Sequence, residues 1–133
     1  MASPDSLELA RVWLTKACSD LEAARLLIAR EHKYLDIGSY HCQQAAEKAL
    51  KAFLTAKEIP FPKTHSLEDV LALCVPANRD FARFQDHCEK LTPLVAEFRY
   101  PDGPDAPPLT QAQQVLQLAD EVYVFCEQQL SGA

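Results

Sequence analysis

The chain has 133 residues, of which 13 are Lys or Arg and 19 are Asp or Glu, so its formal net charge is −6. A chain of this length can form one domain that buries a core without disulfides or a structural metal. The acidic balance argues against a broad basic face for duplex DNA. No apolar run approaches the roughly 20 residues that a membrane-spanning helix needs, and the many Ala, Leu, Glu, Gln and Lys residues favour helix.

The first residues carry acids early and lack the basic region and apolar core of a signal peptide, so we expect a cytoplasmic protein. Zinc sites usually draw their ligands from closely spaced pairs, and the sequence contains no CxxC. An odd number of scattered cysteines favours buried, reduced thiols over disulfides. We therefore expect no metal and no cofactor, with five thiols at Cys18, Cys42, Cys74, Cys88 and Cys126.

Residues 5–30 are predicted to form the first helix, because Ser3 can cap it and Pro4 suits its first turn. Its apolar residues recur at intervals of three and four, which makes one stripe along the helix. A second helix is predicted over residues 35–57, with many alanines that allow a neighbouring helix to approach closely. His41 falls on the apolar row of this helix and is expected to be a core or interface residue.

Two prolines after the second helix end it, and Thr64 or Ser66 is expected to cap a short helix over 66–74. A longer helix is predicted over 78–98, with a kink or break at Pro93. A proline-rich loop follows, and residues 111–130 form the last helix. The expected fold class is all-α, an up-and-down four-helix bundle with one short extra helix, in a single domain over residues 1–133.

The stretch HCQQAAEKALKAFL, residues 41–54, is unusually polar for a helix of this bundle. Gln44 and Lys48 stand four residues apart and share a face, and Glu47 and Lys51 form an acid-first pair at the same spacing. One interpretation is a solvated stripe whose pairs support the helix. The other is a groove in which Gln44, Lys48 and Lys51 bind a phosphate or the carboxylate of a partner.

Three pieces of the sequence, in this order, together resemble the HEPN domain family. They are SDLEAARLLI at 19–28, SYHCQQAAEKALKAFL at 39–54 followed by KTHSLEDVLALC, and EFRYPD at 97–102. The resemblance covers roughly residues 7–130. It implies a bundle of four to five helices, frequent homodimerisation and a role in nucleotide or RNA biology, often beside minimal nucleotidyltransferases. It also leaves open that Gln44 and Glu47 belong to a buried network that only builds the fold.

The ribonuclease members of this family carry an arginine, four to six residues and then a histidine near the last helix. Here no histidine follows Arg99, and Arg83 and His87 have only three residues between them. Acid–base chemistry on RNA needs a well-placed histidine or a substitute. The departure favours a non-catalytic module over a metal-independent RNA-cleaving toxin with an altered site, which remains the alternative together with a purely structural assembly protein.

The expected function is therefore a nucleotide-binding module or the partner of a nucleotidyltransferase, within a toxin–antitoxin type system. The expected partners are a second copy of the chain, a nucleotidyltransferase and a nucleotide, with no membrane and no duplex DNA. Arg99 could hold a phosphate and Tyr100 stack on a base, or they could neutralise a helix end and plug the bundle. No catalytic residue is predicted, and the candidates for ligand binding are Gln44, Glu47, Lys48, Lys51, His65, Arg99 and Tyr100.

Overall fold

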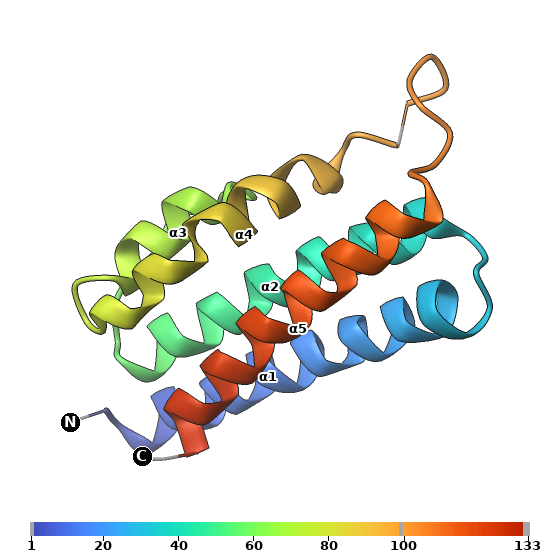
Figure 1. Cartoon of the computed structure of the whole chain (residues 1–133). Helices are drawn as coiled ribbons and strands as arrows, with labels where there is room; N and C mark the ends of the chain where they lie inside the picture. Colours follow the sequence, from blue (N-terminus) through green and yellow to red (C-terminus); the bar gives the residue numbers. More distant parts are fainter. Residues whose placement is uncertain (1, 99, 132–133) are drawn as a thin grey trace.

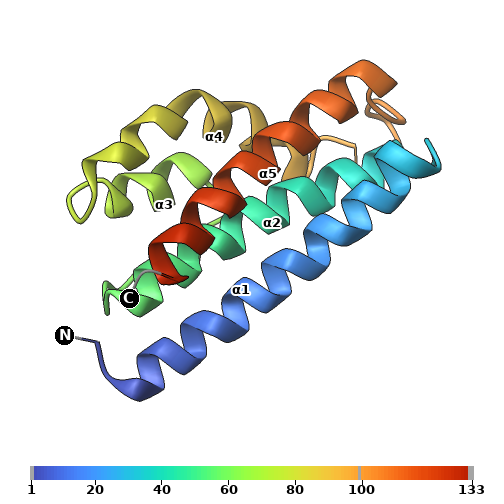
Figure 2. The same ribbon diagram turned by 60° about the horizontal axis from the view of Figure 1, so that its bottom comes forward.

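The computed structural model describes residues 2–98 and 100–131, and within them every regular element is a helix. Three long helices run alongside one another, and the shorter helices cover the remaining side of the bundle (Figures 1 and 2). This confirms the predicted all-α bundle. The long helices are α1 (Pro4–Ala24), which continues into the π-helical segment η1 (Arg25–Arg30), α2 (Leu35–Ala56) and α5 (Leu109–Ser131).

The helix ends follow the predicted caps. The Ser3 hydroxyl accepts a hydrogen bond from the Ser6 amide at 3.1 Å, and Pro4 occupies the first turn of α1. Of the two residues proposed to cap α3 (Leu67–Cys74), Ser66 is the one that does so, because its hydroxyl accepts from the Asp69 amide. These side chains satisfy amide groups that the first turn of a helix leaves without a backbone partner.

The segment predicted as one helix over 78–98 is shorter and divided, so that prediction is wrong in extent. It consists of η2 (Arg79–Phe84, 3₁₀), α4 (Gln85–Leu91) and η3 (Thr92–Val95, 3₁₀). The predicted break at Pro93 is confirmed, since proline supplies no amide to continue the α-helical bonds. Beside the break, the Thr92 hydroxyl accepts from the Leu67 amide at 3.0 Å and donates to the Glu68 carboxylate, which ties this segment to the start of α3.

The core combines small residues on α2 with an aromatic group contributed by α2, η2 and α5. Phe81 is fully buried, and its ring centroid lies 4.5 Å from that of Phe53 and 4.9 Å from that of Phe125. All five thiols are free. Four of them are buried as predicted, whereas Cys18 is only partly buried, and burial raises the pKa of Cys42, Cys74 and Cys88 to about 12.

Among the described residues, no helix is long and apolar enough to cross a membrane. The described His, Cys, Asp and Glu side chains also form no group of three or more that could hold a metal ion.

Gly38, near the start of α2, packs closely against η1. A Cβ atom at this position would lie 2.6 Å from Ile28 Cγ1, and Ile28 is fully buried. Gly38→Ala is therefore expected to destabilise the protein by about 1–3 kcal/mol, the usual cost of overpacking. Urea unfolding measures this, with Gly103→Ala as the control, because a Cβ there meets its nearest neighbour at 3.5 Å. Equal stabilities of the two variants would contradict the close contact.

Candidate functional site

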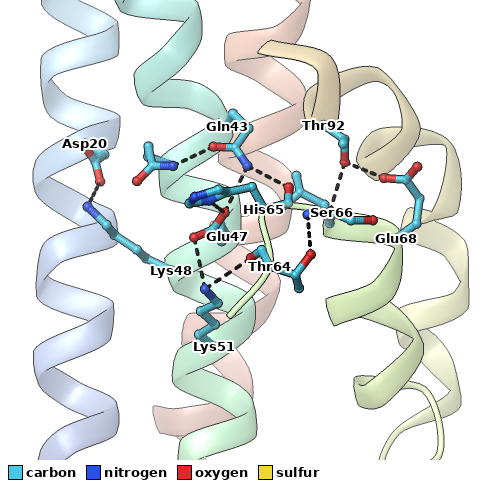
Figure 3. Close-up of polar contacts among 12 residues, drawn as sticks. Asp20, Gln43, Glu47, Lys48, Lys51, Thr64, His65, Ser66, Glu68 and Thr92 are labelled. Atoms are coloured by element: carbon cyan, nitrogen blue, oxygen red, sulfur yellow. Dashed lines mark hydrogen bonds and ion pairs between the residues drawn. The ribbon is translucent and has the colours of Figure 1, made fainter. Parts of the chain in front are cut away.

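A buried polar cluster lies halfway along α2, between α1 and the segment that leads into α3 (Figure 3). We use the name polar cluster for Gln43, Gln44, Glu47, Lys51 and His65. The four residues on α2 are all buried, with Gln43 fully inaccessible and Glu47 4% exposed. Side chains of this kind are rarely buried unless they bind one another.

Glu47 is the centre of the polar cluster. One carboxylate oxygen lies 2.9 Å from His65 Nδ1 and accepts a hydrogen bond from Gln43 Nε2 at 3.1 Å. The other oxygen accepts from Lys51 Nζ at 3.1 Å. Gln43 in turn accepts from Gln44 Nε2 at 2.7 Å. The carboxylate thus has three partners, which offsets much of the cost of burying its charge.

The same side chains hold the connection between α2 and α3 against the bundle. Gln43 Nε2 donates to the backbone carbonyl of His65 at 3.2 Å, and Lys51 Nζ lies 3.5 Å from that of Thr64. The Lys51 ammonium also faces the rings of Trp13 and Phe61, at 5.8 Å and 5.6 Å from their centroids. Lys51 therefore stabilises the contact between α1, α2 and this connection as a buried cation.

A second acid on α1 repeats this arrangement. Asp20 is 8% exposed, and its two oxygens lie 2.7 Å from His41 Nδ1 and 2.7 Å from Lys48 Nζ. Each of the two acids is thus bound by one lysine and one histidine, but they differ in access to solvent. The side chain of His65 is 64% exposed and that of His41 only 29%.

The surroundings of Glu47 hold it in the charged form. Burial alone would raise its pKa, but the hydrogen bonds from His65, Gln43 and Lys51, with the charge of Lys51, lower the pKa below its ordinary value of 4.5. A buried carboxylate with several donors is expected to behave in this way.

This shift makes stability depend on acid pH. In the folded protein the pKa of Glu47 lies below 4.5, whereas an unfolded chain has the ordinary value. Around that pH the unfolded chain binds more protons, so the contribution is complete above 4.5 and is lost as the pH falls through the folded pKa. Urea unfolding at pH 7 and at about pH 3.5 should show a smaller loss for Glu47→Gln than for the wild type. Equal losses would contradict a charged, stabilising Glu47.

The structure brings together four of the seven predicted site residues: Gln44, Glu47, Lys51 and His65 lie in the polar cluster. The solvated-stripe interpretation is wrong for the first three, because they are buried and bind one another or Gln43 in a network. Lys48 lies beside them but binds Asp20. Tyr100 is 64% exposed and begins the segment 100–108, which projects from one end of the bundle (Figure 1), and Arg99 is outside the described residues.

Sequence reasoning missed two of the residues that complete these contacts. The contact of Gln43 with Glu47 could have been predicted from spacing, since Gln43 precedes Glu47 by four residues and lies on the same face of the helix. Asp20 borders the apolar stripe of α1, between Ala17 and Leu21, and a carboxylate at that place needs a partner. The spacing of residues along α1 cannot identify the partners of Asp20, because His41 and Lys48 lie on another helix, 21 and 28 residues away in the chain.

A cavity of about 430 Å³ opens next to His41, between the first half of α2 and the segment that follows α4. Its walls include the aromatic side chains of Tyr40 and Phe98 and the carboxylate of Asp36. A concave site with apolar walls and a few polar groups is the usual form of a small-molecule pocket.

Comparison with known proteins places the chain in a family. The sequence model of the HEPN domain matches residues 10–129, nearly the whole chain. The chain belongs to the HEPN domain family. The residues that form the polar cluster all lie within the matched range, so they are part of the HEPN domain of this protein.

Solved structures of other proteins share this HEPN fold. TT1696 from Thermus thermophilus is 28% identical with a TM-score of 0.76, over 90% of this chain and 96% of that one. An HEPN domain protein, TM0613, from Thermotoga maritima is 26% identical with a TM-score of 0.72, over 90% and 97%. ST0689, an archaeal HEPN homologue, is 24% identical with a TM-score of 0.71, over 91% and 97%, and shows the fold alone. The search among curated proteins gave no match.

Proposed function

We propose that this HEPN domain is a non-catalytic binding module that forms a homodimer and associates with a nucleotidyltransferase, in a toxin–antitoxin type pair. The observation that carries the proposal is that the polar side chains of α2 bind one another. Lys51 is 9% exposed at its side chain and bound to Glu47, and Lys48 is bound to Asp20. Cations engaged in this way are already paired with acids of the chain, which leaves partner binding to the exposed surface.

An exposed apolar surface supports the same proposal. Leu9 and Val12 on α1 are 53% and 46% exposed, and they line a shallow hollow of about 240 Å³ with Trp13 and Lys16. Exposed apolar side chains that lie together are typical of surfaces that bind another protein. The α1 surface, meaning Leu9, Val12, Trp13 and Lys16, is therefore our candidate for the contact with a partner.

The test is association of the purified chain with itself and with any nucleotidyltransferase encoded beside its gene. Sedimentation should show a dimer, and a tagged chain should retain the nucleotidyltransferase in a pull-down. Val12→Lys is expected to weaken at least one of these contacts. Gln113→Lys, which adds the same charge at an exposed position of α5, should weaken neither. A monomeric chain that retains no nucleotidyltransferase would contradict the proposal.

Nucleotide binding is the second candidate function, and the cavity beside His41 favours it. Tyr40 and Phe98 offer rings on which a base can stack. A nucleotide at a hundred times its dissociation constant should stabilise the protein by about 2.7 kcal/mol, which raises Tm by on the order of 10 °C for a domain of this size. Ile37→Lys, at a residue that lines the cavity, should abolish that rise in Tm. Lys48→Ala tests the other site, the one predicted from the sequence, in which Gln44, Lys48 and Lys51 bind a phosphate. No shift with any nucleotide would remove this candidate.

The alternative of an RNA-cleaving toxin needs Arg99, Tyr100 and His65 to act on one substrate. The contacts of the described residues join His65 to Glu47 and do not join it to Tyr100. Growth arrest on expression, relieved by Arg99→Ala, would favour the toxin over the binding module.

A further inference from the structure

The four histidines of the chain differ in what holds their rings and in how far the rings reach solvent. His41 and His87 each meet a carboxylate, but their side chains are only 29% and 18% exposed. His32 is exposed and makes no hydrogen bond with any other residue that the structure describes. His65 alone among these combines a ring nitrogen 2.9 Å from a buried carboxylate with a side chain that is 64% exposed.

The contact with Glu47 determines which nitrogen of His65 carries the proton. A carboxylate only accepts hydrogen bonds, so Nδ1 must donate, and in the neutral ring the lone pair is then on Nε2. Nδ1 faces Glu47 (Figure 3), and Nε2 has no hydrogen-bond partner among the residues that the structure describes. The result is an exposed imidazole with a fixed tautomer and an open nucleophilic nitrogen.

The backbone on both sides of this ring is also held. The carbonyl of His65 accepts from Gln43 Nε2 at 3.2 Å, and the carbonyl of Thr64 lies 3.5 Å from Lys51 Nζ. The Ser66 amide donates to the Thr64 hydroxyl at 3.1 Å. An exposed side chain on a held backbone loses little freedom when it reacts, which favours attack on an electrophile.

The buried carboxylate can stabilise the product of such a reaction. A covalent bond at Nε2 leaves the proton on Nδ1 and makes the ring cationic. Glu47, at 5% side-chain exposure and with Gln43 and Lys51 as further donors, would then face that cation at hydrogen-bond distance. An opposite charge at this distance stabilises the phosphorylated, cationic ring electrostatically.

We propose that His65 is an acceptor for a phosphoryl group at Nε2. The donor is a small molecule of the acyl phosphate or phosphoramidate class, whose phosphorus carries a good leaving group. The Nε2 lone pair forms the P–N bond while the bond from phosphorus to the leaving group breaks. The leaving group departs with that electron pair, as a carboxylate from an acyl phosphate or as ammonia from a phosphoramidate already protonated on nitrogen, and the His65 ring keeps the proton on Nδ1.

The position of His65 suits an anionic group. His65 immediately precedes Ser66, the N-cap of α3, and the positive end of a helix dipole favours negative charge nearby. Lys63, exposed and two residues earlier, adds a cation to the same connection. The first turn of α3 also carries two acids, and the carboxylate of one of them, Glu68, accepts a hydrogen bond from the Thr92 hydroxyl. The acceptor role is separate from the proposed binding of a partner and does not depend on it.

Phosphoramidate tests the proposal on the whole purified chain. After a short incubation near pH 7, peptide mass spectrometry measures the rate of phosphorylation at each histidine, and His32 is the internal control for an exposed ring without a carboxylate. We expect His65 to react about tenfold faster than His32. Phosphorus NMR should place the label on Nε2, and His65→Gln should remove the fast phase. Equal rates at His65 and His32, or a label on Nδ1, would overturn the proposal.

Glu47→Gln separates the role of the carboxylate from that of exposure. In this variant the charge is lost, and the rate at His65 should fall to about that at His32, while the rate at His32 stays unchanged. A rate at His65 that is unaffected in a folded Glu47→Gln chain would also overturn the proposal. The comparison of the two histidines in the wild type decides the matter even if this variant does not fold.

Discussion

Replacing Glu47 by alanine is expected to lower the free energy of unfolding by about 3–5 kcal/mol, the range for removing one partner of a buried ion pair. Lys51 would lose its carboxylate while its side chain remains only 9% exposed. Gln43 and His65 would each lose an acceptor as well. Urea unfolding at pH 7, followed by circular dichroism, measures the change, and the connection from α2 to α3 should become more sensitive to proteolysis.

A surface pair of the same kind provides the control. Asp86 and Lys90 are also four residues apart, with the acid first and an N–O distance of 3.1 Å, but their side chains are 70% and 47% exposed. Asp86→Ala should change stability by no more than about 0.5 kcal/mol, because exposed ion pairs contribute little. If Glu47→Ala cost no more than Asp86→Ala, Glu47 could not be the centre of a buried network.

The contrast between these two pairs shows what the sequence could and could not predict. Spacing alone placed Glu47 and Lys51 on one helix face, and the structure confirms their contact. Spacing is identical for Asp86 and Lys90, so it cannot distinguish a buried pair from an exposed one. Burial of Glu47 depends on residues 57–66 folding back along α2, and that depends on distant contacts such as the packing of Trp13 on Phe61, at 6.3 Å between centroids.

The helices themselves followed from local signals. Ser3 and Ser66 cap where predicted. The recurrence of apolar residues gave α1 together with η1, α2 and α5 to within two residues at each end, although it did not predict that residues 25–30 are π-helical. The segment 79–95 was predicted less well, because over six residues a 3₁₀ repeat of 3.0 and an α repeat of 3.6 place nearly the same side chains inward. Phe81 and Phe84, three residues apart, are both buried here, and an α-helix would also place them on one face.

The second large effect is expected in a double variant. Glu47→Met combined with Lys51→Met replaces the buried ion pair by apolar side chains of similar volume, and such replacements are often neutral or stabilising. The double variant should therefore recover most of the roughly 3–5 kcal/mol lost in Glu47→Met alone. Urea unfolding of the wild type, both single variants and the double variant gives the coupling energy of the pair. Additive losses would contradict a direct interaction.

The double variant also separates stability from chemistry at His65. Methionine at position 47 cannot accept a hydrogen bond of comparable strength, so Nδ1 of His65 would no longer be fixed as the donor. We expect the double variant to be about as stable as the wild type. Phosphoramidate should phosphorylate its His65 no faster than its His32. In that case the fold does not need Glu47 and Lys51 as charges, and their presence is explained by the histidine that they orient. If fast phosphorylation persists in the double variant, exposure alone accounts for the reactivity of His65, and the polar cluster serves packing.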